Sequence, residues 1–305
     1  MLLGNLQRRA YEIRAAKQSE IVTGLVVQGG GSRGIYSMGA LQELQECGLA
    51  NAFDHVFGAS AGALNASCLL SGQTEEAVDS YLNDMTTSRF VNWLRFRKIV
   101  DVDFLVDQIM TARRGLCVDR ILKSPSTLHV VLTDALTRRA HMVTNRDDQV
   151  DWVEVLRATM ALPWLYGRAV PLNGRTYLDG CLVEPVPLLR ALAAGCTDIL
   201  VVLTISPHFR TNPGWLIDLL ERPLLRRYPR EVHALIRADR ERFNVTMDQI
   251  EHAHCRPGHV RLHVIHPSDA GQMVSAITTN RRKLQACALM GRSDARRFTS
   301  IMGTD

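Results

Sequence analysis

Short apolar runs, each bounded by turn residues, recur along the first two thirds of the chain. They cover residues 21–28, 54–59, 128–134 and 197–206. Short apolar runs between turn signals are typical of buried strands. Stretches with helical periodicity lie between them, at residues 63–70, 151–162 and 187–195. Strands that alternate with helices form a parallel sheet covered by helices, so the pattern predicts an α/β fold with a largely parallel sheet.

The remaining segments are mostly helical in pattern. They are residues 1–20, 74–113, 213–254 and 272–302, the first of them polar and the third rich in Arg. Two further strands are expected, one at 140–144 that pairs with 128–134 and one near 260–266. The sequence therefore predicts three parts, which are a polar helical lead-in (1–20), an α/β domain (21–206) and a mostly helical C-terminal region (207–305).

The composition is that of an ordinary globular protein. The 305 residues suggest one or two domains, and 46% of them are apolar, which is ample for a packed core. Solubility alone accounts for the net charge of +5, so no nucleic-acid partner is expected. The seven cysteines are scattered without CxxC spacing, which favours a reducing compartment.

The N-terminus carries charged residues where a signal peptide would need an apolar stretch. No run approaches the roughly 20 apolar residues of a membrane span. These features predict a cytoplasmic protein whose membrane contact is at most peripheral, at the inner face of a membrane.

A turn of small residues follows the second apolar run. It reads Gly58-Ala59-Ser60-Ala61-Gly62 and leads into the helix-like stretch at 63–70. Small residues on both sides let the chain turn sharply from strand to helix, which leaves the serine Oγ exposed above the sheet. The turn thus indicates a nucleophile elbow. The alternative is a small-residue turn where a helix packs closely on the sheet.

A glycine-rich turn, Gly29-Gly30-Gly31-Ser32-Arg33-Gly34, follows the first apolar run. Backbone N–H groups at a helix N-terminus stabilise negative charge, and a serine nucleophile needs such donors for the oxyanion formed on attack. The turn also fits a dinucleotide-binding GxGxxG motif. Asp54 has about the spacing which that motif requires of an acidic residue, but it precedes its strand and would lie at the wrong end of the sheet. The turn therefore favours an oxyanion hole.

A serine nucleophile also needs a base. The chain order serine, acid, histidine is that of an α/β-hydrolase, but none of the five histidines within 252–266 has distinctive surroundings. Asp179 is the stronger candidate, because a turn at Asn173-Gly174 leads into a short strand that Asp179-Gly180 ends. An ordinary turn aspartate is the alternative.

Three motifs in this order resemble the patatin-like phospholipase family. They are the glycine turn at 29–34, the elbow at 58–62, and an Asp-Gly that an apolar residue and a proline follow. The segment 158–163 and the stretch 174–187 are also similar to the family. The resemblance covers roughly residues 21–206.

This resemblance implies a three-layer α/β/α fold and hydrolysis of acyl esters in lipids by a Ser–Asp dyad. By motif position, Ser60 would be the nucleophile and Asp179 the general base. The oxyanion turn would consist of Gly29, Gly30, Gly31 and Gly34, with Arg33 between them. The elbow and the acid turn would depend on Gly58, Gly62 and Gly180.

The chain departs from the family pattern next to Asp179. Cys181 stands where Gly or Ala is usual, and Glu184-Pro185 stands where an acidic residue followed by Asn is common. Cysteine is small, so the turn is expected to survive, and we do not expect Cys181 to act as a nucleophile.

Two other segments carry residue types that suit ligands or membranes. The spacing in His252–His259 matches no common zinc site, so no metal or cofactor is expected. The stretch 205–245 has eight Arg against five Asp and Glu, and it is interpreted as a solvated helix face or an interfacial surface.

The sequence thus predicts a serine acyl hydrolase acting on a lipid or phospholipid ester. Two alternatives stay open, which are a Ser-His-Asp esterase on an α/β-hydrolase fold and a catalytically silent lipid-binding protein. A nucleotide-binding oxidoreductase is disfavoured by the position of Asp54.

Overall fold

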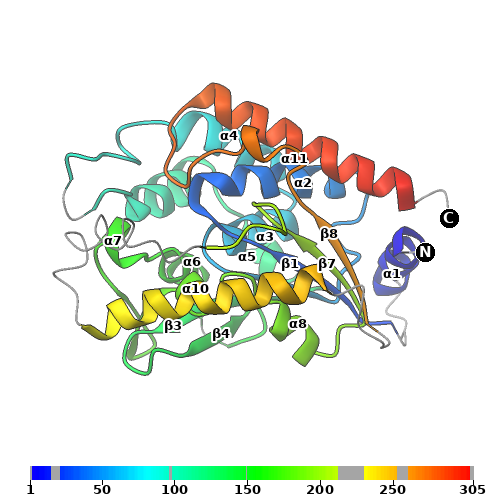
Figure 1. The fold of residues 1–305 in the computed structure, drawn as a ribbon, viewed down its shortest axis with the longest axis horizontal. Helices are drawn as coiled ribbons and strands as arrows, with labels where there is room; N and C mark the ends of the chain where they lie inside the picture. Colours follow the sequence, from blue (N-terminus) through cyan, green and yellow to red (C-terminus); the bar gives the residue numbers. More distant parts are fainter. Residues whose placement is uncertain are drawn as a thin grey trace.

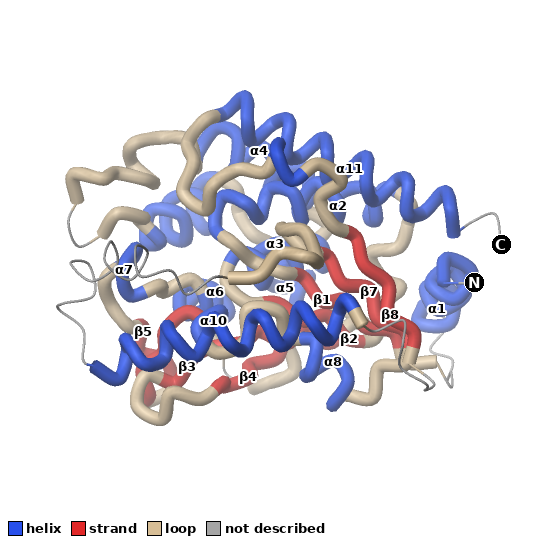
Figure 2. The backbone as a smooth tube through the Cα atoms, in the orientation of Figure 1, coloured by secondary structure: helices blue, strands red, loops and turns tan. Residues whose placement is uncertain are grey.

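The chain folds as a central sheet between two layers of helices, as the sequence predicts (Figures 1 and 2). The computed structural model describes residues 2–14, 21–95, 98–148, 150–211, 230–252 and 260–302. In the described part, the strand order is β5-β6-β3-β2-β1-β7-β8, and β4 also pairs with β3.

The sheet is largely parallel. Its parallel strands are β1 (Thr23–Val27), β2 (His55–Gly58), β3 (Thr127–Asp134), β7 (Asp198–Val202) and β8 (Arg261–Ile265). The antiparallel strands are β4 (Ala140–Thr144), β5 (Val170–Leu172) and β6 (Arg175–Asp179). The expected pairing of 140–144 with 128–134 is confirmed.

Helices cover both faces of this sheet because successive side chains of a strand point to opposite sides. Leu25 and Val27 belong to the core beneath α2 (Gly34–Glu46), α3 (Ala61–Ser71) and α11 (Arg281–Met302). Val26 belongs to the core beneath α8 (Leu188–Ala193) and α10 (Arg230–Glu251). Smaller elements complete the layers, namely α1 (Leu2–Arg14), α4 (Thr74–Asp79), the π-helical η2 (Ser80–Asp84) and η3 (Phe104–Arg113), α5 (Val118–Leu122), α6 (Trp152–Thr159) and α7 (Pro163–Tyr166).

The C-terminal part extends the same sheet and helical layer. Strand β8 pairs with β7, and α11 lies along α2 (Figure 1). The hydroxyl of Tyr36 donates a hydrogen bond to Asp294 at 2.9 Å. Arg296 binds Glu43 at 2.8 Å. The domain boundary expected at residue 206 stays a prediction.

Three expected elements differ in the structure. Residues 85–95 and 98–101, expected to be helical, instead form turns and loops, with a bridge between Val91 and Val100. The helix expected over 151–162 ends at Thr159, and Pro163 begins α7, because proline suits the first position of a helix. The helix expected from 272 begins at Arg281.

The sequence pattern also missed β5. This strand has Pro171 at its centre and lies at the edge of the sheet, which is where strands tolerate a residue without an N–H group. Its three residues are too few to show any alternation of apolar and polar positions.

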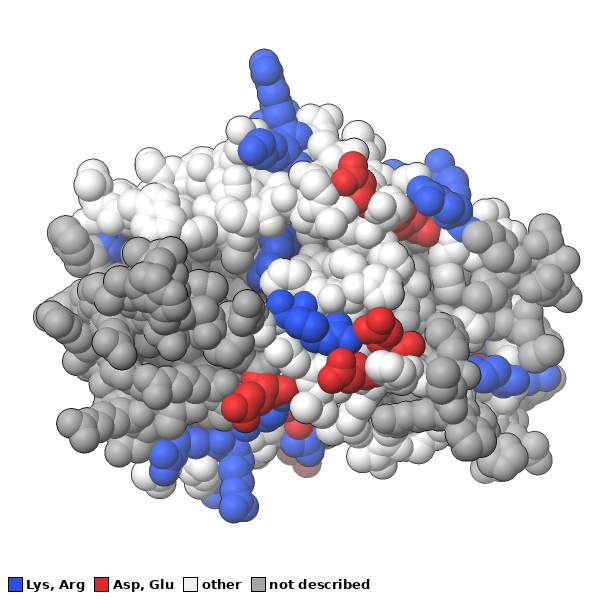
Figure 3. All heavy atoms as spheres, viewed as in Figure 1, with Lys and Arg blue, Asp and Glu red and all other residues white. Residues whose placement is uncertain are grey.

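Charged side chains of both signs lie next to one another on the visible face (Figure 3). Arg210, for example, binds Asp248 at 2.7 Å. Residues 212–229 of the stretch 205–245 and residues 253–259 of the histidine-rich segment fall outside the described residues. Within the described ranges, no helix combines the length and the hydropathy needed to cross a membrane.

Candidate active site

The pairing of β3 brings Ser60 and Asp179 together. Strand β2 pairs with the first half of β3, up to Gly58 opposite Val130. Strand β6 pairs with the second half, where Asp179 lies opposite Leu132. Because β4 occupies the other edge of β3, strands β2 and β6 lie end to end along one edge. Their final residues are therefore about 7 Å apart along β3.

The backbone at Ser60 is strained. Its φ of 55° and ψ of −136° place it in a region that non-glycine residues rarely adopt, at the N-terminus of α3. The glycines beside it are required by close packing. A Cβ at Gly62 would lie 2.2 Å from the carbonyl oxygen of Val27, and one at Gly58 would lie 2.7 Å from the nitrogen of Ala63.

The side chains of Ser60 and Asp179 contact each other directly. The Ser60 hydroxyl donates a hydrogen bond to Asp179 Oδ2 at 2.9 Å. The other carboxylate oxygen, Oδ1, accepts the backbone N–H of Cys181 at 2.9 Å. The backbone of Cys181 makes this contact, so it is present with cysteine in place of the usual Gly or Ala.

Two threonines that the sequence reasoning missed hold this pair. The Ser60 N–H donates to Thr159 Oγ1 at 2.9 Å, and the Thr133 hydroxyl donates to the Asp179 carbonyl at 2.7 Å. Thr159 lies in the segment 158–163 that resembles the family, so this resemblance could have indicated a role for it. Thr133 sits inside an apolar run that gives no such signal.

Asp179 is completely buried, and this burial raises its pKa to about 6. The hydrogen bonds from Cys181 and Ser60 favour the charged form and oppose this rise. The carboxylate is thus ionised at neutral pH yet more basic than an exposed aspartate. Gly180 keeps the turn tight, since a Cβ there would lie 2.0 Å from the Val131 carbonyl oxygen.

The glycine turn lies against the elbow. A Cβ at Gly29 would lie 3.1 Å from the Ser60 Cβ, and the Gly29 carbonyl accepts the Thr204 hydroxyl at 2.7 Å. Gly30 and Gly31 have φ values of 136° and 59°. Within the described residues, no acceptor bonds the N–H groups of Gly30 and Gly31. Gly34 begins α2, and its carbonyl accepts the Asn65 amide at 2.7 Å.

These residues share one cavity of about 460 Å³. Ser60, Asp179 and residues 29–33 of the glycine turn line it, and apolar side chains such as Phe90 and Leu105 line most of the rest. Arg33 also lines the cavity. Its buried Nε has no hydrogen-bond partner, its guanidinium pairs with no described carboxylate, and burial lowers its pKa.

The residues of the alternative mechanisms lie elsewhere. No described histidine lines this cavity, and His208 is exposed, with Glu251 at 2.9 Å. His254 and His259 fall outside the described residues. Asp54 binds Arg9 and the backbone of Thr23, at the end of β1 opposite to the glycine turn. Among the described residues, no His, Cys, Asp and Glu side chains gather as a metal site.

Comparison with known proteins identifies the family of this chain. The family model described as patatin-like phospholipase matches residues 25–192, more than half of the chain. The chain belongs to the patatin-like phospholipase family. The family is thus the one that the three motifs resemble.

Two curated relatives are each 30% identical to this patatin-like chain over the aligned residues. The uncharacterized protein YjjU of Escherichia coli is similar over 199 residues, which are 63% of this chain and 54% of YjjU. The human patatin-like phospholipase domain-containing protein 4 is similar over 168 residues, 52% of this chain and 64% of that protein. The chain therefore spans between about half and two thirds of the length of these relatives.

The crystal structure of VipD from Legionella pneumophila has a similar fold. It superposes with a TM-score of 0.51 over 93% of this chain and 67% of VipD, at 15% identity. At this identity the similarity concerns the fold alone. It extends past residue 192, into the part where β8 and α11 complete the α/β body.

Proposed function

We propose that this patatin-like protein hydrolyses acyl esters of lipids, with phospholipids or lysophospholipids as the substrate class. The observation that carries the proposal is the 2.9 Å hydrogen bond from the Ser60 hydroxyl to the buried carboxylate of Asp179, at a mainly apolar cavity. A buried base with a raised pKa beside a hydroxyl on a strained turn suits nucleophilic catalysis.

In the proposed reaction, Ser60 Oγ attacks the acyl carbonyl carbon while its proton passes to Asp179 Oδ2. The N–H groups of Gly30 and Gly31 would donate to the oxyanion. The ester C–O bond then breaks, and Asp179 returns the proton to the leaving alcohol. Water attacks the acyl-enzyme in the same way, with its proton passing through Asp179, and releases the fatty acid. No metal or cofactor takes part.

The proposal is tested by a panel of lipids and p-nitrophenyl esters offered to the wild type and to Ser60→Ala. Hydrolysis by the wild type alone would support it. Lipid binding without hydrolysis that depends on Ser60 would instead identify a silent lipid-binding protein.

The glycine turn gives a separate prediction. Gly30→Val should lower kcat by about 10²–10³, because φ of 136° is strained for a side chain and the oxyanion donors would move. Gly48 is a matched control, since it has φ of 75° and open space around its Cβ position. Gly48→Val should lower stability but keep kcat. An equal loss of kcat in both variants would contradict the oxyanion role.

Arg33 is proposed to meet the lipid phosphate, because a buried guanidinium without a carboxylate partner suits an anion. In the same assay, Arg33→Ala should impair phospholipid hydrolysis more than neutral-ester hydrolysis. Equal effects on both substrates would argue against phosphate contact.

We also propose peripheral membrane contact through Trp93 and Leu94. The segment that lines the cavity with Phe90, Val91 and Val100 carries these two side chains on its outer turn, 61% and 84% exposed. Exposed Trp and Leu side chains favour the membrane interface.

Replacing both Trp93 and Leu94 with alanine should lower hydrolysis of phospholipid vesicles about tenfold but spare a soluble short-chain ester. The control is Leu289→Ala, on α11, where the side chain is 59% exposed. An unchanged rate on vesicles would exclude this contact. The cytoplasmic location stays a prediction, and cell fractionation would test it.

A further inference from the structure

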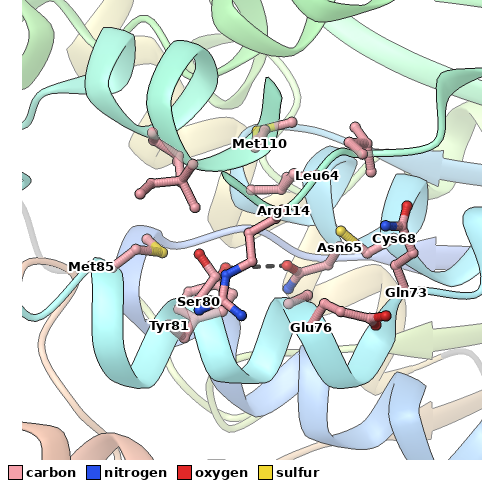
Figure 4. A pocket seen from close by; sticks show the side chains of 14 residues that line it. Leu64, Asn65, Cys68, Gln73, Glu76, Ser80, Tyr81, Met85, Met110 and Arg114 are labelled. Atoms are coloured by element: carbon pink, nitrogen blue, oxygen red, sulfur yellow. Dashed lines mark hydrogen bonds between the residues drawn. The ribbon is translucent and has the colours of Figure 1, made fainter. Parts of the chain in front are cut away.

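A second, smaller cavity of about 40 Å³ adjoins the site cavity (Figure 4). Leu64, Tyr81, Met85 and Leu105 line both cavities. These four side chains therefore form the wall between the two spaces. Tyr81 is fixed, because its hydroxyl donates to Asn65 Oδ1 at 3.2 Å. The other three wall residues are apolar.

The interior of the small cavity is apolar. Cys68 of α3, Ala77 of α4 and Met110 of η3 line it, together with Ile109 and Leu116. Leu64 and Met110 both line the small cavity (Figure 4). Burial raises the pKa of the Cys68 thiol to about 12. A space lined mainly by apolar side chains offers few hydrogen-bond partners to water, so it suits hydrocarbon.

Two of the polar residues that line this cavity, Gln73 and Arg114, are bound to neighbours. The Gln73 side chain accepts the Cys117 N–H at 2.7 Å and donates to the Gly115 carbonyl at 3.2 Å. Arg114 binds Asp84 at 2.8 Å. These two side chains are thus engaged with the protein itself, and apolar side chains form most of the remaining lining.

The wall can rearrange at low cost. Met85 is unbranched and adapts its shape easily. It directly follows the π-helical η2, and Leu105 belongs to the π-helical η3. π-helical turns are rare and occur frequently at functional sites. Rotation of the Met85 and Leu105 side chains would join the two cavities.

We infer that the small cavity receives the terminal carbons of the substrate's acyl chain, so that Leu64, Met85 and Leu105 set the chain length which the protein prefers. The inference rests on the proposed acyl-ester hydrolysis at Ser60. The ester would lie at Ser60 and the chain would run along the apolar side of the site cavity towards this wall.

The volume of the small cavity determines how strongly it should affect the preference for chain length. A space of 40 Å³ holds roughly one or two chain carbons, given the ~30 Å³ share of a water molecule in the liquid. Each buried methylene favours binding by about fourfold. Access to the small cavity should therefore raise kcat/KM by about 4–15-fold for chains long enough to reach it.

The test measures kcat/KM for p-nitrophenyl esters from butanoyl to octadecanoyl. Ala77→Leu fills the small cavity from a half-buried position of α4 and should lower the ratio of long-chain to short-chain kcat/KM by about 4–15-fold. Met110→Ala enlarges the cavity and should move the optimum to a longer chain. Met247→Ala is the control, because Met247 is buried in the core beneath α10 and lines neither cavity.

The outcomes separate this inference from the proposed function. Hydrolysis that depends on Ser60 but shows the wild-type chain-length profile in both cavity variants would overturn the inference alone. The same shift in Met247→Ala would also overturn it, since general destabilisation would then explain the change. No hydrolysis that depends on Ser60 would overturn the proposed function and the inference together.

Discussion

Replacing Ser60 with alanine is expected to lower kcat on the order of 10⁶-fold, as removal of a serine nucleophile does elsewhere. The Ser60 hydroxyl is the group that donates to Asp179 Oδ2, at 2.9 Å. Without that hydroxyl, Asp179 could at most activate water. The oxyanion donors would remain, so a small residual rate is expected.

A fluorophosphonate probe, which labels nucleophilic serines, tests the role of Ser60 without a substrate. The wild type should take up one label, at Ser60, and Ser60→Ala should take up none. Ser71→Ala is the matched control, because Ser71 is buried in the same helix and only donates to the Cys68 carbonyl. Labelling of a different serine in the wild type would reject Ser60 as the nucleophile.

Asp179→Asn is expected to lower kcat by about 10⁴ or more, in the range found when the acid of a catalytic triad is replaced by its amide. Asparagine keeps the shape of the side chain, and its oxygen can still accept the Cys181 N–H. It cannot take the serine proton. The fold should persist while the acyl-enzyme no longer forms at a useful rate.

Asp179→Asn is also expected to change the stability of the protein, which should rise while the activity falls. Burial raises the pKa of Asp179 from 3.8 to about 6, so the folded protein holds this proton more tightly than the unfolded chain does. Stability is therefore lost as the pH rises from about 4 to 6. Asparagine never ionises, so the variant should be more stable at pH 7, by at most roughly 3 kcal/mol. The gain should vanish below pH 4.

Asp134 supplies the control for this comparison. It is buried one residue before the turn that joins β3 and β4, where its carboxylate accepts the N–H groups of Leu136 and Thr137. The Thr137 N–H lowers its pKa. Asp134→Asn should therefore lose stability at neutral pH and keep activity. If Asp179→Asn instead kept its activity and lost stability at neutral pH, as is expected of Asp134→Asn, the proposed role of Asp179 would be wrong.

The pH profile completes the argument. If the free enzyme uses ionised Asp179 as the base, kcat/KM of the wild type should rise with pH through about 6 and then level off. A histidine base would give a pH profile with a similar midpoint, so the profile of the wild type is compared with that of His208→Ala. His208 is exposed and lies outside the cavity, so this variant should keep the wild-type profile.

The sequence by itself determined the local features of this protein. Apolar runs located β1, β2, β3 and β7, because burial on both faces selects continuous apolar residues. The small residues at 58–62 predicted the strained turn at Ser60, because the close approach of backbone to backbone excludes larger side chains there. Both kinds of information are carried by residues that are neighbours in the chain.

Tertiary structure decided the rest. Ser60 and Asp179 are 119 residues apart, and only the sharing of one edge of β3 by β2 and β6 sets their contact. The cavity walls from Phe90 to Leu105 come from a segment whose pattern predicted helix. The wall shared by the two cavities depends on side chains from α3 and two π-helical segments. Strand pairing and packing between distant segments leave no periodic signal in the sequence, so geometry of this kind appears only when the chain is folded.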